Sequence, residues 1–117
     1  MINISAENLK EYYDCLAQEF EYEGELAIWQ LPGVGNGPFR DDPPEFKLYV
    51  RRCILRLLEV GAVASHGGSD GPTFYTDAAF VGLGPEETAD RILAELAEFD
   101  DPCWCGVWFV RPRLVGR

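Results

Sequence analysis

The chain has 117 residues, with twenty acidic residues against ten basic ones and a formal net charge of −10 at pH 7. This charge disfavours nucleic acid and anionic membranes as partners, because both would be repelled. No stretch approaches the roughly 20 consecutive apolar residues that a membrane span needs. A single domain over residues 1–117 is therefore expected, and an apolar share of 47 % is enough to build its core.

The N-terminal segment does not have the form of a secretory signal. Residues 1–5 show no basic stretch followed by a long apolar run. In that setting cysteines are expected to be reduced thiols rather than a disulfide framework. We therefore expect a protein of a bacterial-type cytoplasm with four free cysteines: Cys15, Cys53, Cys103 and Cys105.

The first predicted element is an amphipathic helix with Ser5 as its N-cap. Apolar side chains recur at helical spacing and form one stripe, made of Leu9, Tyr12, Tyr13, Leu16 and Phe20. The opposite side is polar and carries Glu7, Glu11, Asp14 and Gln18. The apolar run 26–31, bounded by Gly24 and by Pro32, then predicts a buried strand.

The second predicted helix has the clearest boundaries. Asp42 suits the N-cap, Pro43 the first helical position, and Glu45 completes a capping box. Gly61 is expected to stop the helix. Its wide core face consists of Phe46, Tyr49, Val50, Cys53, Ile54, Leu57 and Leu58. Leu48 and Leu55 lie off this face. Their apolar side chains are expected to be buried either by another element of the same chain or by a second copy of it, so a homodimer stays an open alternative.

The second half of the chain predicts strands at 62–65 and 73–76, joined by a turn at 66–72. Residues 78–83 are expected to extend the second of these strands past a bulge. A third helix opens at 84–87, where acidic residues favour the N-terminal dipole. Its buried stripe is Ala89, Ile92, Leu93 and Leu96. A last strand, 107–110, ends before Pro112.

These elements give the order helix, then β-α-β-β-α-β. The second part is the order of a ferredoxin-like two-layer sandwich, so the predicted class is α+β. The alternative is a winged-helix-like arrangement, in which the second helix is followed by a hairpin wing.

Few residues qualify for catalysis or for holding a cofactor. The one histidine, His66, falls in the predicted turn. The sequence has no G-x-S-x-G motif whose serine this histidine could activate as a general base. The glycine-rich loop 33–37 follows a strand and precedes a helix, but acidic residues at the helix start would repel phosphate. We therefore expect no catalytic residue, no metal site and no cofactor.

A pair of cysteines is the remaining chemical candidate. Cys103 and Cys105 have a C-x-C spacing, whereas a redox pair more usually has C-x-x-C at a helix N-terminus. Asp100 and Asp101 precede them and would raise the thiol pKa values. A thiol-redox protein is thus an alternative, and a small-ligand-binding regulatory domain with a concave apolar pocket is another.

The second helix has a basic side of Lys47, Arg51, Arg52 and Arg56. Because the overall charge is negative, these side chains are expected to pair with acidic residues of neighbouring elements rather than to read nucleic acid.

Three segments in the C-terminal third resemble bacterial toxin-immunity proteins. They are the helical stretch 88–93, the turn Asp101-Pro102 and the aromatic strand 107–109. The resemblance implies a non-enzymatic inhibitor that blocks a toxin, often a basic nuclease. A docking surface for such a basic protein is expected at Glu7, Glu11, Asp14, Glu21, Glu23, Asp100, Asp101 and Trp104. Among the tryptophans, Trp104 is the candidate exposed anchor, and Trp29 and Trp108 are expected in the core.

Overall fold

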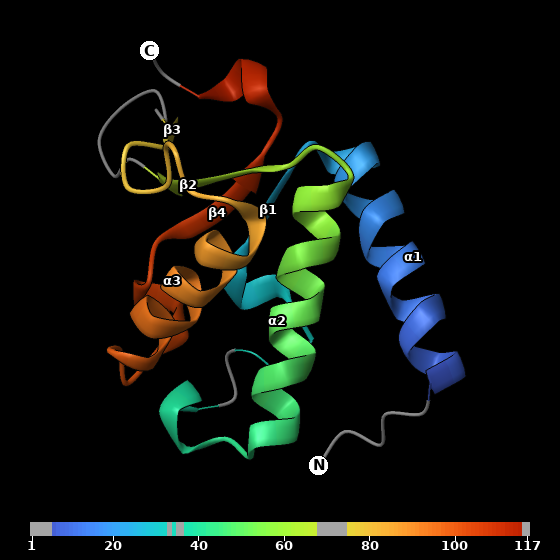
Figure 1. Cartoon of the computed structure of the whole chain (residues 1–117), viewed down its shortest axis with the longest axis vertical. Helices are drawn as coiled ribbons and strands as arrows, with labels where there is room; N and C mark the ends of the chain where they lie inside the picture. Colours follow the sequence, from blue (N-terminus) through green and yellow to red (C-terminus); the bar gives the residue numbers. More distant parts are fainter. Residues whose placement is uncertain (1–5, 33, 35–36, 68–74, 116–117) are drawn as a thin grey trace.

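Three α-helices lie side by side in the described part of the protein. The computed structural model describes residues 6–32, 34, 37–67 and 75–115. Within them the helices are α1 (Ala6–Glu23), α2 (Pro44–Glu59) and α3 (Pro85–Ala97). α2 lies in the middle and contacts both of the others (Figure 1). None of the helices in the described residues is long and apolar enough to cross a bilayer.

α1 buries the second half of its predicted stripe. Leu16 and Phe20 are buried and Tyr13 is half-buried, whereas Tyr12 is 42 % exposed. The expected N-cap, Ser5, lies outside the described residues, as does the side chain of Leu9. The helix stops where the chain turns to a φ of 79° at Gly24, a conformation that glycine adopts without strain.

α2 begins one residue later than predicted. Pro43 is the N-cap and Pro44 the first helical residue, and no side chain caps this end. The reason is the proline pair, because a residue that precedes a proline is pushed out of the helical region. Pro43 accordingly has an extended ψ of 151°. Asp42 therefore lies outside the helix and is not its cap.

The C-terminal stop of α2 at Gly61 is confirmed. Gly61 has a φ of 98°. Its N–H donates to the carbonyl of Leu58 at 3.2 Å, and the N–H of Ala62 donates to that of Leu57 at 3.0 Å. This pair of bonds is the Schellman motif, which satisfies carbonyls that a helix end leaves free.

The core face of α2 largely matches the prediction. Its buried residues are Tyr49, Val50, Cys53, Ile54 and Leu57. Leu55 is half-buried against the same core, whereas Leu48 is 49 % exposed. Among the described residues, Leu55 is thus partly covered by other side chains, whereas Leu48 remains largely exposed. α3 also begins as predicted, with Gly84 as N-cap and Pro85 at the first position.

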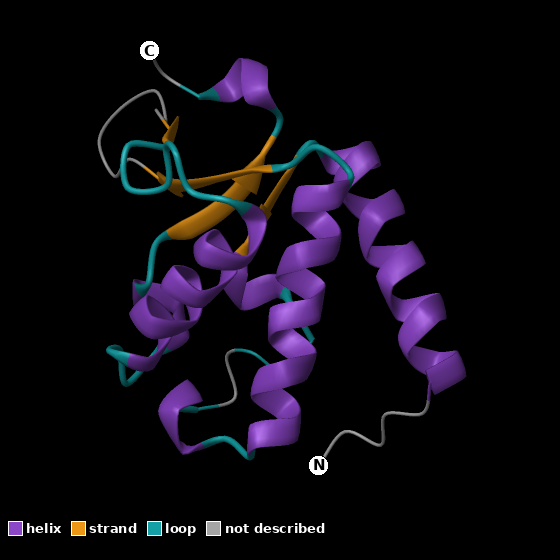
Figure 2. Ribbon diagram, in the orientation of Figure 1, coloured by secondary structure: helices purple, strands orange, loops and turns teal. Residues whose placement is uncertain are grey.

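The four strands of the described residues form one antiparallel sheet (Figure 2). They are β1 (Glu25–Ala27), β2 (Val63–Gly67), β3 (Tyr75–Thr76) and β4 (Val107–Val110), in the order β1-β4-β2-β3. The α+β class is confirmed. The ferredoxin-like arrangement is not confirmed, because the order of elements along a chain does not decide which strands pair. Here the last strand, β4, lies between β1 and β2.

Two predicted strands differ from the structure. The strand expected over 26–31 ends at Ala27, because a 3₁₀ turn, η1 (Ile28–Gln30), begins there and the Gln30 side chain accepts the Ala27 N–H at 2.7 Å. The extension expected over 78–83 is wrong: this segment is a turn. The carbonyl of Asp77 accepts the N–H groups of Phe80 and Val81 at 2.8 and 3.0 Å. This turn places the ring of Phe80 in the core.

The two faces of the sheet have different surroundings, since side chains alternate along a strand. One face packs into the main core together with buried residues of all three helices, and it carries Leu26, Ala64, Val107 and Phe109. The opposite face carries a smaller cluster of Tyr75, Val110 and Val115, with Val63 and Trp108 packed against it. The candidate site lies on this second face, at the β1 edge.

Candidate functional site

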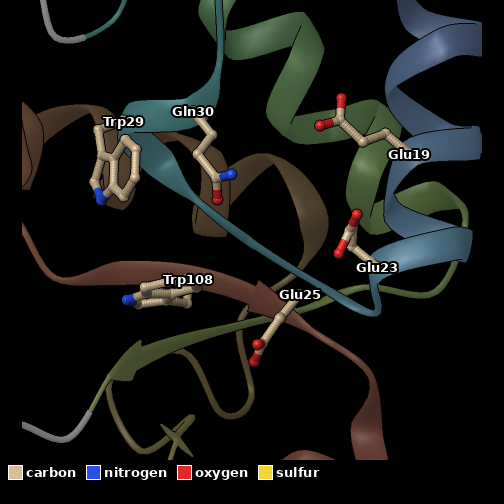
Figure 3. Close-up of a pocket in the computed structure, with 6 residues that line it drawn as sticks. All are labelled: Glu19, Glu23, Glu25, Trp29, Gln30 and Trp108. Atoms are coloured by element: carbon tan, nitrogen blue, oxygen red, sulfur yellow. The ribbon is translucent and has the colours of Figure 1, made fainter.

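A surface hollow of about 340 Å³ lies between the end of α1 and the β1 edge of the sheet (Figure 3). Its lining comes from four elements: Glu19 and Glu23 of α1, Glu25 of β1, Trp29 and Gln30 of η1, and Trp108 of β4. In Figure 3 the two indoles border one side, and the carboxylates of Glu19 and Glu23 face them from α1. We call this site the Trp–Glu hollow.

α1 brings two of the carboxylates to the hollow. Glu19 and Glu23 are four residues apart, so they project from the same face of the helix. Both are exposed, and neither makes an ion pair with a described residue. Like charges at this spacing cost a helix about 0.2–0.5 kcal/mol. The arrangement therefore opposes the stability of α1.

The end of α1 adds a second unfavourable feature. Its last turn contains Glu21 and Glu23 and no basic residue. The helix dipole places partial negative charge at this end, where an exposed acidic residue costs about 0.3–1 kcal/mol. One compensation comes from outside the helix, since the Arg111 guanidinium donates to the Glu21 carbonyl. This end of α1 remains acidic on its surface.

The indole of Trp108 is held in place by its neighbours across the sheet. A Cβ on Gly67 would stand 2.9 Å from both Cδ1 and Nε1 of this indole, so the position next to it must lack a side chain. The ring of Tyr75 packs against the indole with centroids 5.7 Å apart. Gly67 and Tyr75 thus determine where Trp108 lies.

Tyr75 also orients one carboxylate of the hollow. Its hydroxyl donates a 2.6 Å hydrogen bond to Oε2 of Glu25. Burial of the phenol, the bond to Glu25 and the negative charge of that group raise the pKa of Tyr75 to about 12. The phenol therefore stays a donor at neutral pH, and one oxygen of Glu25 has a fixed partner.

The expectation that Trp29 and Trp108 belong to the core is wrong for Trp29, whereas Trp108 packs against the smaller hydrophobic cluster. Trp29 is 43 % exposed, and Trp108 is half-buried on the face of the sheet away from the main core. Trp29 is exposed because the strand ends at Ala27 and the chain enters the 3₁₀ turn. The spacing of Glu19 and Glu23, followed by Glu25 and Trp29, was the available sequence signal for this site.

The acidic residues predicted for docking have different surroundings. On α1, Glu11, Glu21 and Glu23 are exposed. Asp14 is instead half-buried, and its carboxylate accepts a 3.2 Å hydrogen bond from Arg56. The side chain of Glu7 lies outside the described part of the structure.

The second predicted docking region lies around the turn that follows α3. Trp104, in the 3₁₀ turn η3 (Pro102–Trp104), is 77 % exposed. Asp101 is exposed, and Asp100 forms an ion pair with Arg40. Since η3 contacts η1, which carries Trp29, the turn with Trp104 adjoins an element that lines the Trp–Glu hollow.

The prediction that the basic side of α2 pairs with neighbouring acids is confirmed for Arg51 and Arg56, whereas Lys47 and Arg52 form no ion pair with an acid among the described residues. Arg51 lies 2.9 Å from Asp90, and Arg56 bridges Asp14 and Glu59 at 3.2 Å each. Lys47 donates to the backbone carbonyl of Arg40 at 2.9 Å. Arg51, Arg56 and Lys47 are therefore occupied within the chain.

His66 does not lie in a turn, contrary to the expectation. It belongs to β2, opposite Thr76 and Val107. Its Nε2 is 3.1 Å from Oε2 of Glu95, and its ring stacks on Phe80 with centroids 5.1 Å apart. This half-buried pair joins β2 to α3.

The described cysteines of the core are poorly suited to thiolate chemistry. Cys105 is buried, and its burial is the main cause that raises its pKa to about 11. Cys53 is buried in α2, where burial raises its pKa to about 12. The side chain of Cys103 lies outside the described part of the structure. The described residues contain no group of three His, Cys, Asp or Glu side chains placed to hold a metal ion.

No protein-family model, curated protein or solved structure matches this chain. The resemblance to toxin-immunity proteins therefore stays a prediction, and a functional assignment depends on the geometry of the site.

Proposed function

We propose that this protein is a non-enzymatic binding protein that docks a basic protein partner through the acidic end of α1. Its role in this proposal is that of an immunity protein that neutralises a basic toxin in the cytoplasm. The observation that carries the proposal is the set of exposed glutamates without ion pairs around the Trp–Glu hollow.

The distribution of ion pairs supports a partner of opposite charge. The arginines Arg40, Arg51 and Arg56 are matched by acids of the same chain. Glu11, Glu19 and Glu23, in contrast, have no ion-pair partner among the described residues. Repulsion between Glu19 and Glu23 and the helix dipole at Glu23 disfavour these two charges in the free protein. A basic partner would remove both penalties and would be attracted from a distance.

Exposed aromatic side chains on α1, η1 and η3 also support docking of a protein partner. Tyr22, on α1, is 86 % exposed, and Trp29 and Trp104 are 43 % and 77 % exposed. Tyrosine and tryptophan are enriched among the residues that carry binding energy at protein interfaces. Aromatic anchors beside unpaired carboxylates suit a partner surface that is basic and partly apolar.

The association rate with an isolated partner tests this proposal. A candidate is cross-linked to the protein in its source cells, identified, and purified; capture alone does not count as support. Changing Glu11, Glu19 and Glu23 to glutamine is expected to slow association about tenfold at low salt. Asp14 is left unchanged, because its replacement would remove one of the two ion pairs of Arg56.

The matched control changes three exposed glutamates elsewhere, Glu45, Glu87 and Glu98, and alters the net charge equally. It is expected to change the rate less than twofold. If both variants slow association equally, the total charge matters and the α1 surface does not. If co-production with the partner fails to relieve any growth inhibition that the partner causes, the immunity role is refuted.

A further inference from the structure

The Trp–Glu hollow has the chemistry of a cation site. Its lining combines three glutamates, Glu19, Glu23 and Glu25, with two tryptophans, Trp29 and Trp108. Anions are repelled by such a lining, and a neutral apolar group would desolvate carboxylates without pairing them. A cation is attracted both by the negative charge of the carboxylates and by the indoles, because indole is the aromatic group that attracts cations most strongly.

The size and openness of the hollow favour a single side chain. Its volume of about 340 Å³ is at the lower end of the roughly 300–1,000 Å³ typical of ligand sites. Its glutamates are exposed and Trp29 is 43 % exposed, so the hollow is accessible from solvent. A side chain that projects from another protein can enter it without a rearrangement of the chain.

Three parts of the lining are already fixed before any ligand binds. Gly67 and Tyr75 hold the indole of Trp108, and the Tyr75 hydroxyl holds one oxygen of Glu25 at 2.6 Å. Gln30 is tied to the Ala27 N–H at 2.7 Å. Because these groups are ordered in advance, binding costs less conformational entropy.

We infer that the Trp–Glu hollow binds the guanidinium group of an arginine side chain presented by the basic partner, an inference that rests on the proposed function. A guanidinium is flat enough to stack on an indole, and its fork of N–H donors matches a carboxylate. A lysine ammonium would gain the charge attraction but neither the stacking nor the two-pronged bond.

The test uses three blocked tripeptides, acetyl-Gly-X-Gly-amide, in which X is arginine, lysine or citrulline. Citrulline has nearly the shape of arginine without its charge. The probe is the indole N–H signal of each tryptophan in ¹⁵N-labelled protein. The arginine peptide is expected to shift the signals of Trp29 and Trp108 in a saturable way and to leave that of Trp104 unchanged. Lysine should bind about threefold and citrulline at least about tenfold more weakly.

Two substitutions test whether the arginine peptide binds at the Trp–Glu hollow. Trp29→Ala and Glu23→Gln are each expected to weaken the arginine peptide about threefold to tenfold. The control Glu87→Gln should leave its affinity unchanged. A circular dichroism spectrum and melting curve like those of the parent show that each variant is folded.

Three results would overturn the inference: no saturable shift, equal binding of citrulline and arginine, or tighter binding of spermidine than of the arginine peptide, which would indicate a small-cation site. The proposed function fails separately. If Trp29→Ala leaves partner affinity unchanged while the glutamine triple variant slows association, the docking surface stands and the arginine site does not. If the arginine peptide binds but no basic protein does, the proposed function fails.

Discussion

Replacing Tyr75 with phenylalanine tests how the second face of the sheet is organised. The substitution keeps the ring against Trp108 and removes only the hydroxyl that donates to Glu25 at 2.6 Å. A hydrogen bond to a charged group contributes about 1.5–3 kcal/mol. Because Glu25 is exposed and water can replace the lost donor, we expect the lower end, a loss of about 1.5 kcal/mol in the free energy of unfolding.

Urea unfolding followed by circular dichroism measures this loss, and in a chain of this size it corresponds to about 6 °C in Tm. The matched control is Tyr22→Phe, because Tyr22 is 86 % exposed. The control should change stability by less than about 0.5 kcal/mol. Equal effects of the two substitutions would refute the role of the Tyr75–Glu25 bond.

The pH dependence of the same variant gives a second readout. The pKa of Tyr75 is raised from 10.0 to about 12 in the folded protein. The stability that the phenol contributes is therefore fully present below about pH 10 and is lost as the pH rises toward 12. The difference between the parent and Tyr75→Phe should shrink above pH 10. A difference that stays constant from pH 7 to 11 would contradict this cause of the shift.

Three further substitutions or reactions test particular features of the fold. Gly61→Ala should cost about 1 kcal/mol in urea unfolding, because alanine is strained at a φ of 98° although nothing crowds the position. Gly67→Val should displace the Trp108 indole, seen as a shift of its N–H signal, and an unchanged signal would show that the contact is not tight. In a Cys103→Ser variant, Ellman's reagent at pH 8 should react with the exposed Cys15 within minutes. The buried Cys53 and Cys105 should react only in denaturant. Rapid reaction of all three thiols would refute the burial of the core cysteines.

Local patterns predicted the helices well. The stripe of Leu16 and Phe20, the glycine at 61 and the Gly84-Pro85 start are each determined by residues within a few positions of one another. The start of α2 was displaced by one residue, since the effect of Pro44 on Pro43 outweighed the capping preference of Asp42.

The pairing of strands that are far apart in the sequence was harder to predict. The position of β4 between β1 and β2 depends on contacts between residues about 40 and 80 positions apart, such as Ala64 and Leu26 with Phe109. No local pattern encodes such a choice. At the end of β1, the Ala27 N–H donates to the Gln30 side chain as the 3₁₀ turn begins, and this early end of the strand leaves Trp29 exposed.

The site was predicted in part. The acidic side of α1 was identified, and Glu11, Glu21 and Glu23 are exposed as the docking prediction needs. The hollow itself was missed, because tryptophans are more often core residues and the face of Trp108 depends on the register of the sheet. The pairing of Asp14 with Arg56 likewise required the packing of α1 on α2.

The salt dependence of association most directly tests the claim that the acidic end of α1 docks a basic partner. The association rate of the purified partner is measured at low and at high ionic strength, for the parent and for the variant with glutamine at 11, 19 and 23. We predict a steep fall of the rate with salt for the parent and a much shallower fall for the variant. The same salt dependence in both proteins would contradict the account.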